Sequence, residues 1–331
     1  MAGFFSKAKN KMPPRLVENR FMRDGKALVG VAGAADVKAM VREAVSIIGG
    51  FSALNVRGKS VLVKPNVVSG QPSPATTNPE VVAAVVKILY EEGASKVYVG
   101  DMSAFATLST KKNMKSSGIM QAAVDNGAEV VVFEDHEWIE VKLPEESIVK
   151  TAYVTEWIYR ADVFINLPVV KTHRSASYSI CLKNFIGCTH LKQRPYLIDT
   201  SLWEEIVADF NRAYSPDLNI VDGTVSMIEG GPWSGTTAKT GLIIASGDRV
   251  AADAVGLGII KSFGKWDMVT GKGVWEQKQI KRAIEAGVGK SREEVRLVVG
   301  AGAEPLQGAE PPQGGRDFMD LIEKTRLHCG L

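Results

Sequence analysis

Short apolar runs rich in β-branched residues alternate along the chain with longer segments whose apolar positions recur at helical spacing. Strands that alternate with helices in this way are typical of βα units and of a mostly parallel sheet. The pattern therefore predicts a doubly wound α/β fold with helices on both faces, arranged in one or two lobes. The predicted strands are residues 61–67, 96–101, 129–135, 162–168, 218–223 and 241–248.

The clearest predicted helix begins at Pro79. Asn78 is placed to cap it, Pro79 occupies a first position where a missing N–H is harmless, and Gly93 stops it. Residues 301–317 are rich in Gly and Pro and predict an irregular tail. We therefore divide the chain into an amino-terminal extension (1–26), an α/β domain (27–300) and a tail with a short terminal helix (301–331). The other predicted helices are residues 37–48, 111–126, 202–213, 250–263 and 274–286.

Composition narrows the functional classes. The net charge of +3, from 40 basic and 37 acidic residues, is too small to attract nucleic acid by bulk charge. No stretch approaches the roughly 18 apolar residues of a membrane span, and the basic opening segment lacks the apolar centre of a signal peptide. Three cysteines without a dense framework fit a reducing compartment. We therefore expect a cytoplasmic protein without a membrane or nucleic-acid partner.

Reactive side chains are concentrated between residues 162 and 190. Pro168 closes a predicted strand, so the polar residues after it should lie where a strand meets a loop, the edge at which open α/β sheets bind ligands. Two lysines in one cleft attract an anion, and a histidine exchanges protons near neutral pH. We therefore predict Lys171, His173 and Lys183 as catalytic residues and Asn184 as a substrate-binding residue. The alternative is a solvated basic loop.

A second candidate group surrounds the start of the helix at Pro79. Lys64 and Asn66 follow a predicted strand, and Thr76 and Thr77 precede the helix, whose free N–H groups attract anions. These four residues are predicted to bind the substrate. The alternative is that the threonines only shape a turn and cap the helix.

Two carboxylates end predicted strands. Asp101 and Asp222 are predicted to bind the substrate, at the ends of neighbouring strands that face the lysines. Carboxylates at such positions also form ordinary turns, which is the alternative.

Cys181 and Cys188 are seven residues apart, about 10.5 Å along a straight helix. They can bind one metal only if the helix breaks at Gly187 or a second chain contributes. Cys188, two residues before His190, is the stronger candidate for a metal ligand or a reactive thiolate. Cys181 alternatively serves as a small hydrophobic core residue.

Five ordered segments resemble the conserved blocks of the domain-of-unknown-function 362 family. They are KPNVVSGQPSPATTNPEVV (64–82), VYVGDMS (97–103), INLPVVKTH (165–173), SICLKNFIGC (179–188) and residues 220–255, within a match over roughly residues 27–300. Asn78 stands where many family members have a His. The KPN, TTNPE and KTH segments are also similar to the amino-terminal half of nickel-pincer lactate racemases.

The family is commonly described as binding iron–sulfur clusters. The resemblance therefore implies a cluster with Cys188 and Cys181 as metal ligands. Many family members carry an attached module with Cys-x-x-Cys repeats, and this chain has no Cys-x-x-Cys. One chain lacks four well-spaced cysteines, so a homodimer would have to share the cluster.

The leading functional hypothesis is a small-molecule enzyme acting on a phosphate or carboxylate substrate, with an iron–sulfur cluster as the cofactor that the resemblance implies. One alternative is an iron–sulfur electron-transfer or cluster-carrying protein that meets a redox partner and has no substrate of its own. Another is a noncatalytic anion-binding module. The sequence contains no Walker motif, no complete Gly-x-Gly-x-x-Gly after the first strand, no nucleophile elbow and no paired-histidine zinc motif.

Overall fold

The computed structural model describes residues 10–34, 36–104, 109–300 and 313–331. Within these residues, the main sheet has twelve strands, and its central path runs in the order β15-β3-β14-β12-β9-β4-β5-β6. The strands of this sheet are β2 (Met22–Arg23), β3 (Lys26–Ala32), β4 (Ser60–Pro65), β5 (Lys96–Asp101), β6 (Glu129–Val132), β9 (Val163–Leu167), β10 (Val169–His173), β11 (Ser177–Ser179), β12 (Leu218–Gly230), β13 (Gly235–Ala238), β14 (Leu242–Ser246) and β15 (Val295–Val299).

Most neighbours along the central path are parallel. The strands β12, β9, β4, β5 and β6 form one parallel series, and β15 is parallel to β3. Only β14 on this path runs antiparallel to both of its neighbours. A smaller sheet joins β1 (Asn10–Lys11), β7 (Trp138–Lys142) and β8 (Thr151–Thr155). The structure confirms the predicted mostly parallel α/β fold.

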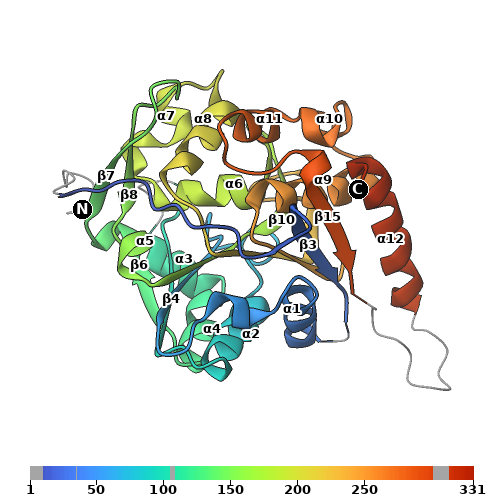
Figure 1. Cartoon of the computed structure of the whole chain (residues 1–331), viewed down its shortest axis with the longest axis horizontal. Helices are drawn as coiled ribbons and strands as arrows, with labels where there is room; N and C mark the ends of the chain where they lie inside the picture. Colours follow the sequence, from blue (N-terminus) through green and yellow to red (C-terminus); the bar gives the residue numbers. More distant parts are fainter. Residues whose placement is uncertain (1–9, 35, 105–108, 301–312) are drawn as a thin grey trace.

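Helices cover both faces of the main sheet (Figure 1). Successive strand side chains point to opposite faces, so Val61 and Val63 of β4 enter one hydrophobic core and Leu62 enters the other. One face carries α1 (Val37–Ser46), α2 (Pro79–Glu91) and α4 (Ile119–Asp125); the other carries α6 (Cys181–Asn184), α8 (Trp203–Phe210), α9 (Arg249–Ser262), α11 (Lys278–Glu285) and α12 (Gln313–Cys329).

The remaining described helices are short. They are α3 (Thr110–Ser116), α5 (Trp157–Arg160), α7 (Pro195–Ile198) and α10 (Asp267–Thr270), with 3-10 turns η2 (Phe51–Leu54), η3 (Phe133–Asp135), η4 (Phe185–Cys188), η5 (Leu191–Gln193), η6 (Asn211–Ala213), η7 (Val274–Glu276) and η8 (Arg292–Glu294).

Two predicted helices are interrupted. The predicted helix 111–126 is divided into α3 and α4, because Gly118 has a φ of 84° and begins α4 outside helical conformation. The predicted helix 274–286 begins as η7 and becomes α11 only after Gln277, whose ψ of 134° is extended.

The strand β3 was missed because glycine and alanine weaken its apolar pattern. Gly30 is required in this strand because a Cβ there would clash with the Ala44 carbonyl of α1 and approach Ile47 to 2.9 Å. The helix can therefore pack closely on the sheet only where the strand lacks a side chain.

Both ends of the described chain join the domain. The strand β2 pairs with β3, and β1 pairs with β7, so residues of the predicted extension contribute to both sheets. The terminal helix α12 is longer than predicted, with 17 residues, and packs along α9. Most of the predicted irregular tail, residues 301–312, lies outside the described residues. None of the described helices is both long enough and apolar enough to cross a membrane.

Candidate active site

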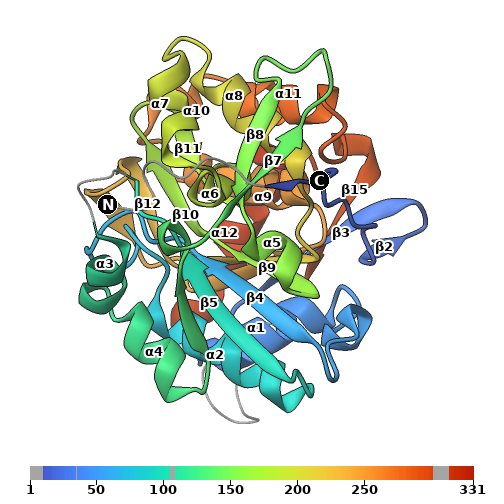
Figure 2. The same ribbon diagram turned by 90° about the vertical axis from the view of Figure 1, so that its left-hand side faces the viewer.

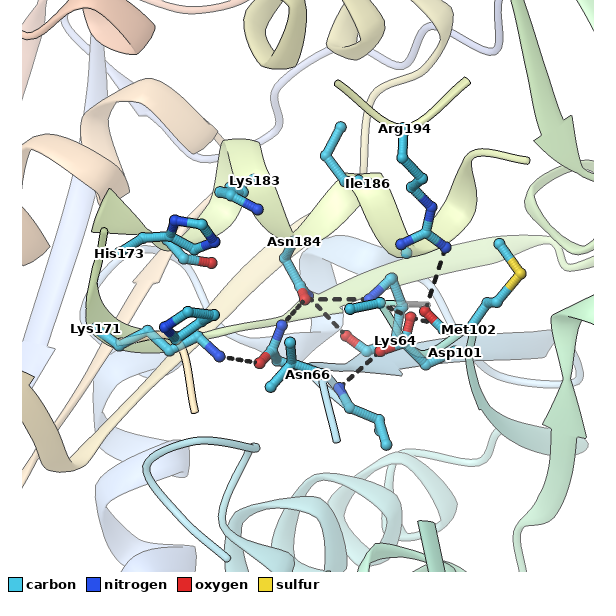
Figure 3. Close-up of a pocket in the computed structure, with 16 residues that line it drawn as sticks. Lys64, Asn66, Asp101, Met102, Lys171, His173, Lys183, Asn184, Ile186 and Arg194 are labelled. Atoms are coloured by element: carbon cyan, nitrogen blue, oxygen red, sulfur yellow. Dashed lines mark hydrogen bonds and ion pairs between the residues drawn. The ribbon is translucent and has the colours of Figure 1, made fainter. Parts of the chain in front are cut away.

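A small pocket with an interior space of about 50 Å³ lies where β4 and β5 end. Figure 2 shows β9, β4 and β5 side by side, and the carboxyl ends of such parallel strands meet at one edge of the sheet. The pocket lining is strongly polar (Figure 3). Its polar side chains come from residues Lys64, Asn66, Asp101, Lys171, His173, Ser179, Lys183, Asn184 and Arg194.

A buried ion pair forms the floor of the pocket. Lys64 at the end of β4 is fully buried, and its Nζ lies 2.7 Å from Oδ1 of Asp101 at the end of β5. The Asp101 carboxylate also accepts hydrogen bonds from the backbone N–H groups of Val67 (2.7 Å) and Met102 (2.8 Å). Because its oxygens already have these partners, Asp101 mainly holds Lys64 in place and neutralises it.

Asn184 connects two sides of the pocket. Its Oδ1 accepts hydrogen bonds from Lys64 Nζ (3.1 Å) and from Asn66 Nδ2 (3.0 Å). Its Nδ2 donates to the Asn166 side chain (2.8 Å) and to the Lys64 carbonyl (3.2 Å). This buried amide therefore fixes the ends of β4, β9 and α6 relative to one another.

Lys171 reaches the pocket from β10 and is almost fully buried. Its Nζ donates hydrogen bonds to Asn66 Oδ1 (2.5 Å) and to the Ala75 carbonyl (2.6 Å). Burial, followed by the charges of Lys183 and Lys64, holds the pKa of Lys171 well below the usual value for lysine, although Asp101 opposes this shift.

His173 lies two residues farther along β10. Its Nδ1 accepts a hydrogen bond from the Ser175 backbone N–H (3.1 Å), so the proton of the neutral ring lies on Nε2. Burial and the nearby charges of Lys183 and Lys171 hold the pKa of His173 well below its usual value. The imidazole is therefore neutral at neutral pH. None of the described residues accepts a hydrogen bond from Nε2.

Lys183 enters the pocket from the short helix α6. Asp253 of α9 fixes the start of this helix by accepting hydrogen bonds from the backbone N–H groups of Cys181 (2.6 Å) and Leu182 (3.2 Å). Lys183 Nζ lies 5.7 Å from the ring centroid of Trp203, and the His173 ring centroid lies 5.8 Å from that of Trp203. Burial and the charge of Arg194 lower the pKa of Lys183 to about 7.

Arg194 was not predicted from the sequence. It is almost completely buried, and its guanidinium donates to the Thr189 carbonyl (3.2 Å) and the Met102 carbonyl (3.4 Å). The sequence offers no signal for this residue, because the surrounding LKQRP segment resembles an ordinary basic turn. Arg194 adds a permanent positive charge to the wall opposite Lys171 (Figure 3).

The structure places three predicted substrate-binding residues outside this pocket. The Thr77 hydroxyl accepts a hydrogen bond from the Asn66 backbone N–H and donates one to the Leu167 carbonyl, both at 2.8 Å. The Thr76 hydroxyl donates a hydrogen bond to the Gln71 backbone carbonyl. Asp222 accepts from the backbone N–H groups of Asn78 (2.8 Å) and Thr224 (3.0 Å). These contacts shape the loop that enters α2.

Two expectations about position were wrong. Asp101 and Asp222 do not lie on neighbouring strands, because β9 and β4 separate β12 from β5. Lys171 and His173 do not lie in a loop after Pro168, because the chain continues as β10, which pairs with β11 and with the unusually long β12. The alternative of a solvated basic loop is also wrong, since both side chains are buried.

The cysteines lie in the core. The α-helix α6 ends at Asn184 and continues directly as the 3-10 turn η4, which contains Gly187 and Cys188, so the two cysteines do not lie on one straight α-helix. Cys181 and Cys188 are nevertheless fully buried, and burial raises the pKa of both thiols. His190, two residues after Cys188, packs edge-on against Trp138.

The described residues contain no group of three or more His, Cys, Asp or Glu side chains that could hold a metal ion. Within one chain, these residues do not fit an iron–sulfur cluster, which commonly takes four cysteine thiolates. A cluster shared between two chains stays a prediction of the sequence.

Comparison with known proteins identifies the family. The model of the family described as Domain of unknown function (DUF362) matches residues 61–258, which is more than half of the chain. The chain belongs to this family. The matched DUF362 region contains the whole pocket described above.

Two further similarities are found. The chain is 29% identical over 229 residues to Thylakoid-associated protein sll1697 of Synechocystis, covering 67% of this chain and 69% of that protein. The solved structure of the lactate racemase apoprotein from Thermoanaerobacterium thermosaccharolyticum overlaps with a TM-score of 0.39 at 10% identity, covering 92% of this chain and 87% of that chain.

Proposed function

We propose that this protein is an enzyme that transfers a proton to or from a small substrate bearing a carboxylate or phosphate group. The observation that carries the proposal is the charge around the pocket. Lys64, Lys171, Lys183 and Arg194 surround one small space, and Asp101 is the acidic side chain among its described lining residues. A site with this excess of cationic groups attracts an anion.

The size of the pocket suggests how the substrate is held. A space of about 50 Å³ has room for only a few water molecules or one small charged group. The anionic group would therefore enter between Lys183 and Arg194, and the rest of the molecule would extend toward Met102 and Pro232 at the lining.

Lys183 would move the proton and His173 would assist it. The neutral ring of His173 has its proton on Nε2, from which it is able to donate a hydrogen bond to a substrate oxygen, and Lys183, with a pKa of about 7, is able to gain or lose a proton near neutral pH. The hydrogen bonds of Lys171 would hold Asn66 and the pocket wall, so its catalytic role would be electrostatic. A simple electron carrier has little use for such a pair, which favours the enzyme over the carrier.

Deuterium exchange tests this proposal. Small carboxylates and phosphates would be incubated with the protein in D2O, and loss of a substrate C–H signal would be followed by proton NMR. His173→Ala should slow the exchange by at least about 100-fold, because it removes the hydrogen-bond donor that polarises the substrate. The exposed His328→Ala is the matched control and should exchange at the normal rate. Equal rates in the wild type and His173→Ala would contradict the proposal.

A further inference from the structure

Three lysines reach the pocket, but they do not have equal freedom to react. Lys64 Nζ is bound to Asp101 and Asn184 and to the Pro65 carbonyl (2.8 Å). Lys171 Nζ is bound to a side-chain amide and a backbone carbonyl. No described residue accepts a hydrogen bond from Lys183 Nζ or forms an ion pair with it. Its amine is therefore the one of the three that remains available to a ligand.

We propose that Lys183 is a nucleophile that forms an imine with the carbonyl group of a small 2-oxo carboxylate. The inference rests on the proposed function, because the same cationic pocket must bind the carboxylate. It adds a substrate class and a covalent step to that function.

The pKa of Lys183 agrees with this role. Only a neutral amine attacks a carbonyl carbon, and at pH 7 about half of the Lys183 side chains are neutral. An ordinary lysine, with a pKa near 10.4, is neutral in only about 1 molecule in 2,500 at this pH.

Formation of the imine requires neither an oxidant nor a reductant. The Nζ lone pair forms a bond to the carbonyl carbon, and one proton passes from the nitrogen to the carbonyl oxygen. The resulting hydroxyl takes a second proton from solvent and leaves as water, and a C=N bond that keeps one proton on nitrogen replaces the C=O bond. His173 lies against the same face of the site, with both side chains near Trp203, so its Nε2 proton is placed to assist the departing oxygen.

Protonation of the imine explains why such a site needs acid–base groups. The positively charged C=N group withdraws electrons from the adjacent carbon and makes its proton easier to remove. Arg194, which lines the same pocket, would hold the carboxylate during this step. Pyruvate, which has one carboxylate and C–H bonds on the carbon beside its carbonyl group, is the probe that fits this chemistry and the small pocket.

Reductive trapping tests the inference. The full-length protein would be treated with pyruvate and sodium borohydride at pH 7, and the modified lysines would be located by peptide mass spectrometry. We expect Lys183 to be modified at least 100-fold faster than the exposed Lys112, which serves as an internal control. Lys183→Arg keeps the positive charge, lacks the nucleophile and should give no adduct in this peptide.

A separate acetate titration distinguishes the two proposals, because acetate has the carboxylate but no reactive carbonyl. If acetate binds and Lys183 reacts no faster than Lys112, the imine inference is overturned and the anion site stands. If acetate does not bind and Lys183 does not react, both proposals are overturned. Selective modification of Lys183, prevented by excess acetate, supports both.

Discussion

Asp101 and Lys64 form a charged pair with almost no solvent exposure, whereas most other ion pairs of the protein lie at its surface. Removing one partner of a buried pair leaves an uncompensated charge, which typically costs about 3–5 kcal/mol. We therefore expect Asp101→Asn to lower the free energy of unfolding by this amount in urea denaturation. Asp24→Asn is the control, because Asp24 forms an exposed pair with Arg296 and its loss should cost less than about 1 kcal/mol. Similar losses in both variants would contradict the buried pair.

The burial of Lys183 should lower the free energy of unfolding of the protein. Its native pKa of about 7 lies below its unfolded value of 10.5, so the unfolded state binds more protons between these two values. The destabilisation is therefore full below pH 7 and diminishes as the pH rises toward 10.5. Lys183→Met should raise the free energy of unfolding by about 1–2 kcal/mol at pH 6 and by less at pH 9. A gain that increases with pH would contradict this assignment.

At the level of single residues, the sequence predicted most of the polar side chains that line the pocket. Lys64, Lys171 and Lys183 were predicted because they follow predicted strands or lie in the reactive cluster after one, at the edge where open α/β sheets bind ligands. Asp222 could not be separated from Asp101 in the same way, because both end predicted strands and only the sheet order shows which one faces the pocket. Arg194 was missed because its burial depends on contacts with segments distant in the sequence.

The 3-10 turn η4 approaches the buried ion pair closely because it contains Gly187. A Cβ at Gly187 would clash with Asp101 Oδ1 and lie 2.7 Å from Lys64 Nζ. Gly187→Ala should therefore separate the pair, lower the free energy of unfolding by about 1–3 kcal/mol and weaken acetate binding. Urea unfolding curves measure the loss of stability, and acetate titrations measure the loss of affinity.

Gly70→Ala is the matched control for this variant. Its Cβ would meet the Ser116 Cβ at 3.1 Å and the Asn113 side chain, but none of the pocket residues. It should bind acetate normally. Normal acetate binding by Gly187→Ala as well would show that this close approach does not shape the site.

Helices and strands could be predicted from the sequence where a single spacing of apolar positions runs through the segment. The helix α2 begins and ends within one residue of its predicted bounds, because Asn78, Pro79 and Gly93 mark its ends. The strand β10 was not predictable, because Pro168 suggested a turn, whereas the backbone remains extended and pairs with β12. Whether such a segment forms a strand is decided by the strands that pair with it, and these are distant in the sequence.

The described residues form two hydrophobic cores and a small cationic pocket, and they contain no cysteine cluster within one chain. The predicted iron–sulfur cluster therefore requires a homodimer in which both chains contribute thiolates. If that cluster exists, the Cys188→Ser variant purified without oxygen should show less visible absorption and contain less iron than the wild type. Cys329→Ser is the control, because the Cys329 thiol donates a hydrogen bond to the Ala254 carbonyl in another part of the core. Iron retained in full by Cys188→Ser would remove this residue from any cluster.

The most direct test of the anion site is the pH dependence of acetate affinity, measured by calorimetric titration at low ionic strength. Acetate remains an anion from pH 6 to pH 9, so changes in affinity report on the protein. Since Lys183 loses its positive charge as the pH rises through about 7, the wild type should bind acetate about tenfold more weakly at pH 9 than at pH 6. Lys183→Met should bind weakly throughout, and the exposed Lys112→Met should behave as the wild type. Equal affinity of the wild type and Lys183→Met at pH 6 would contradict the account.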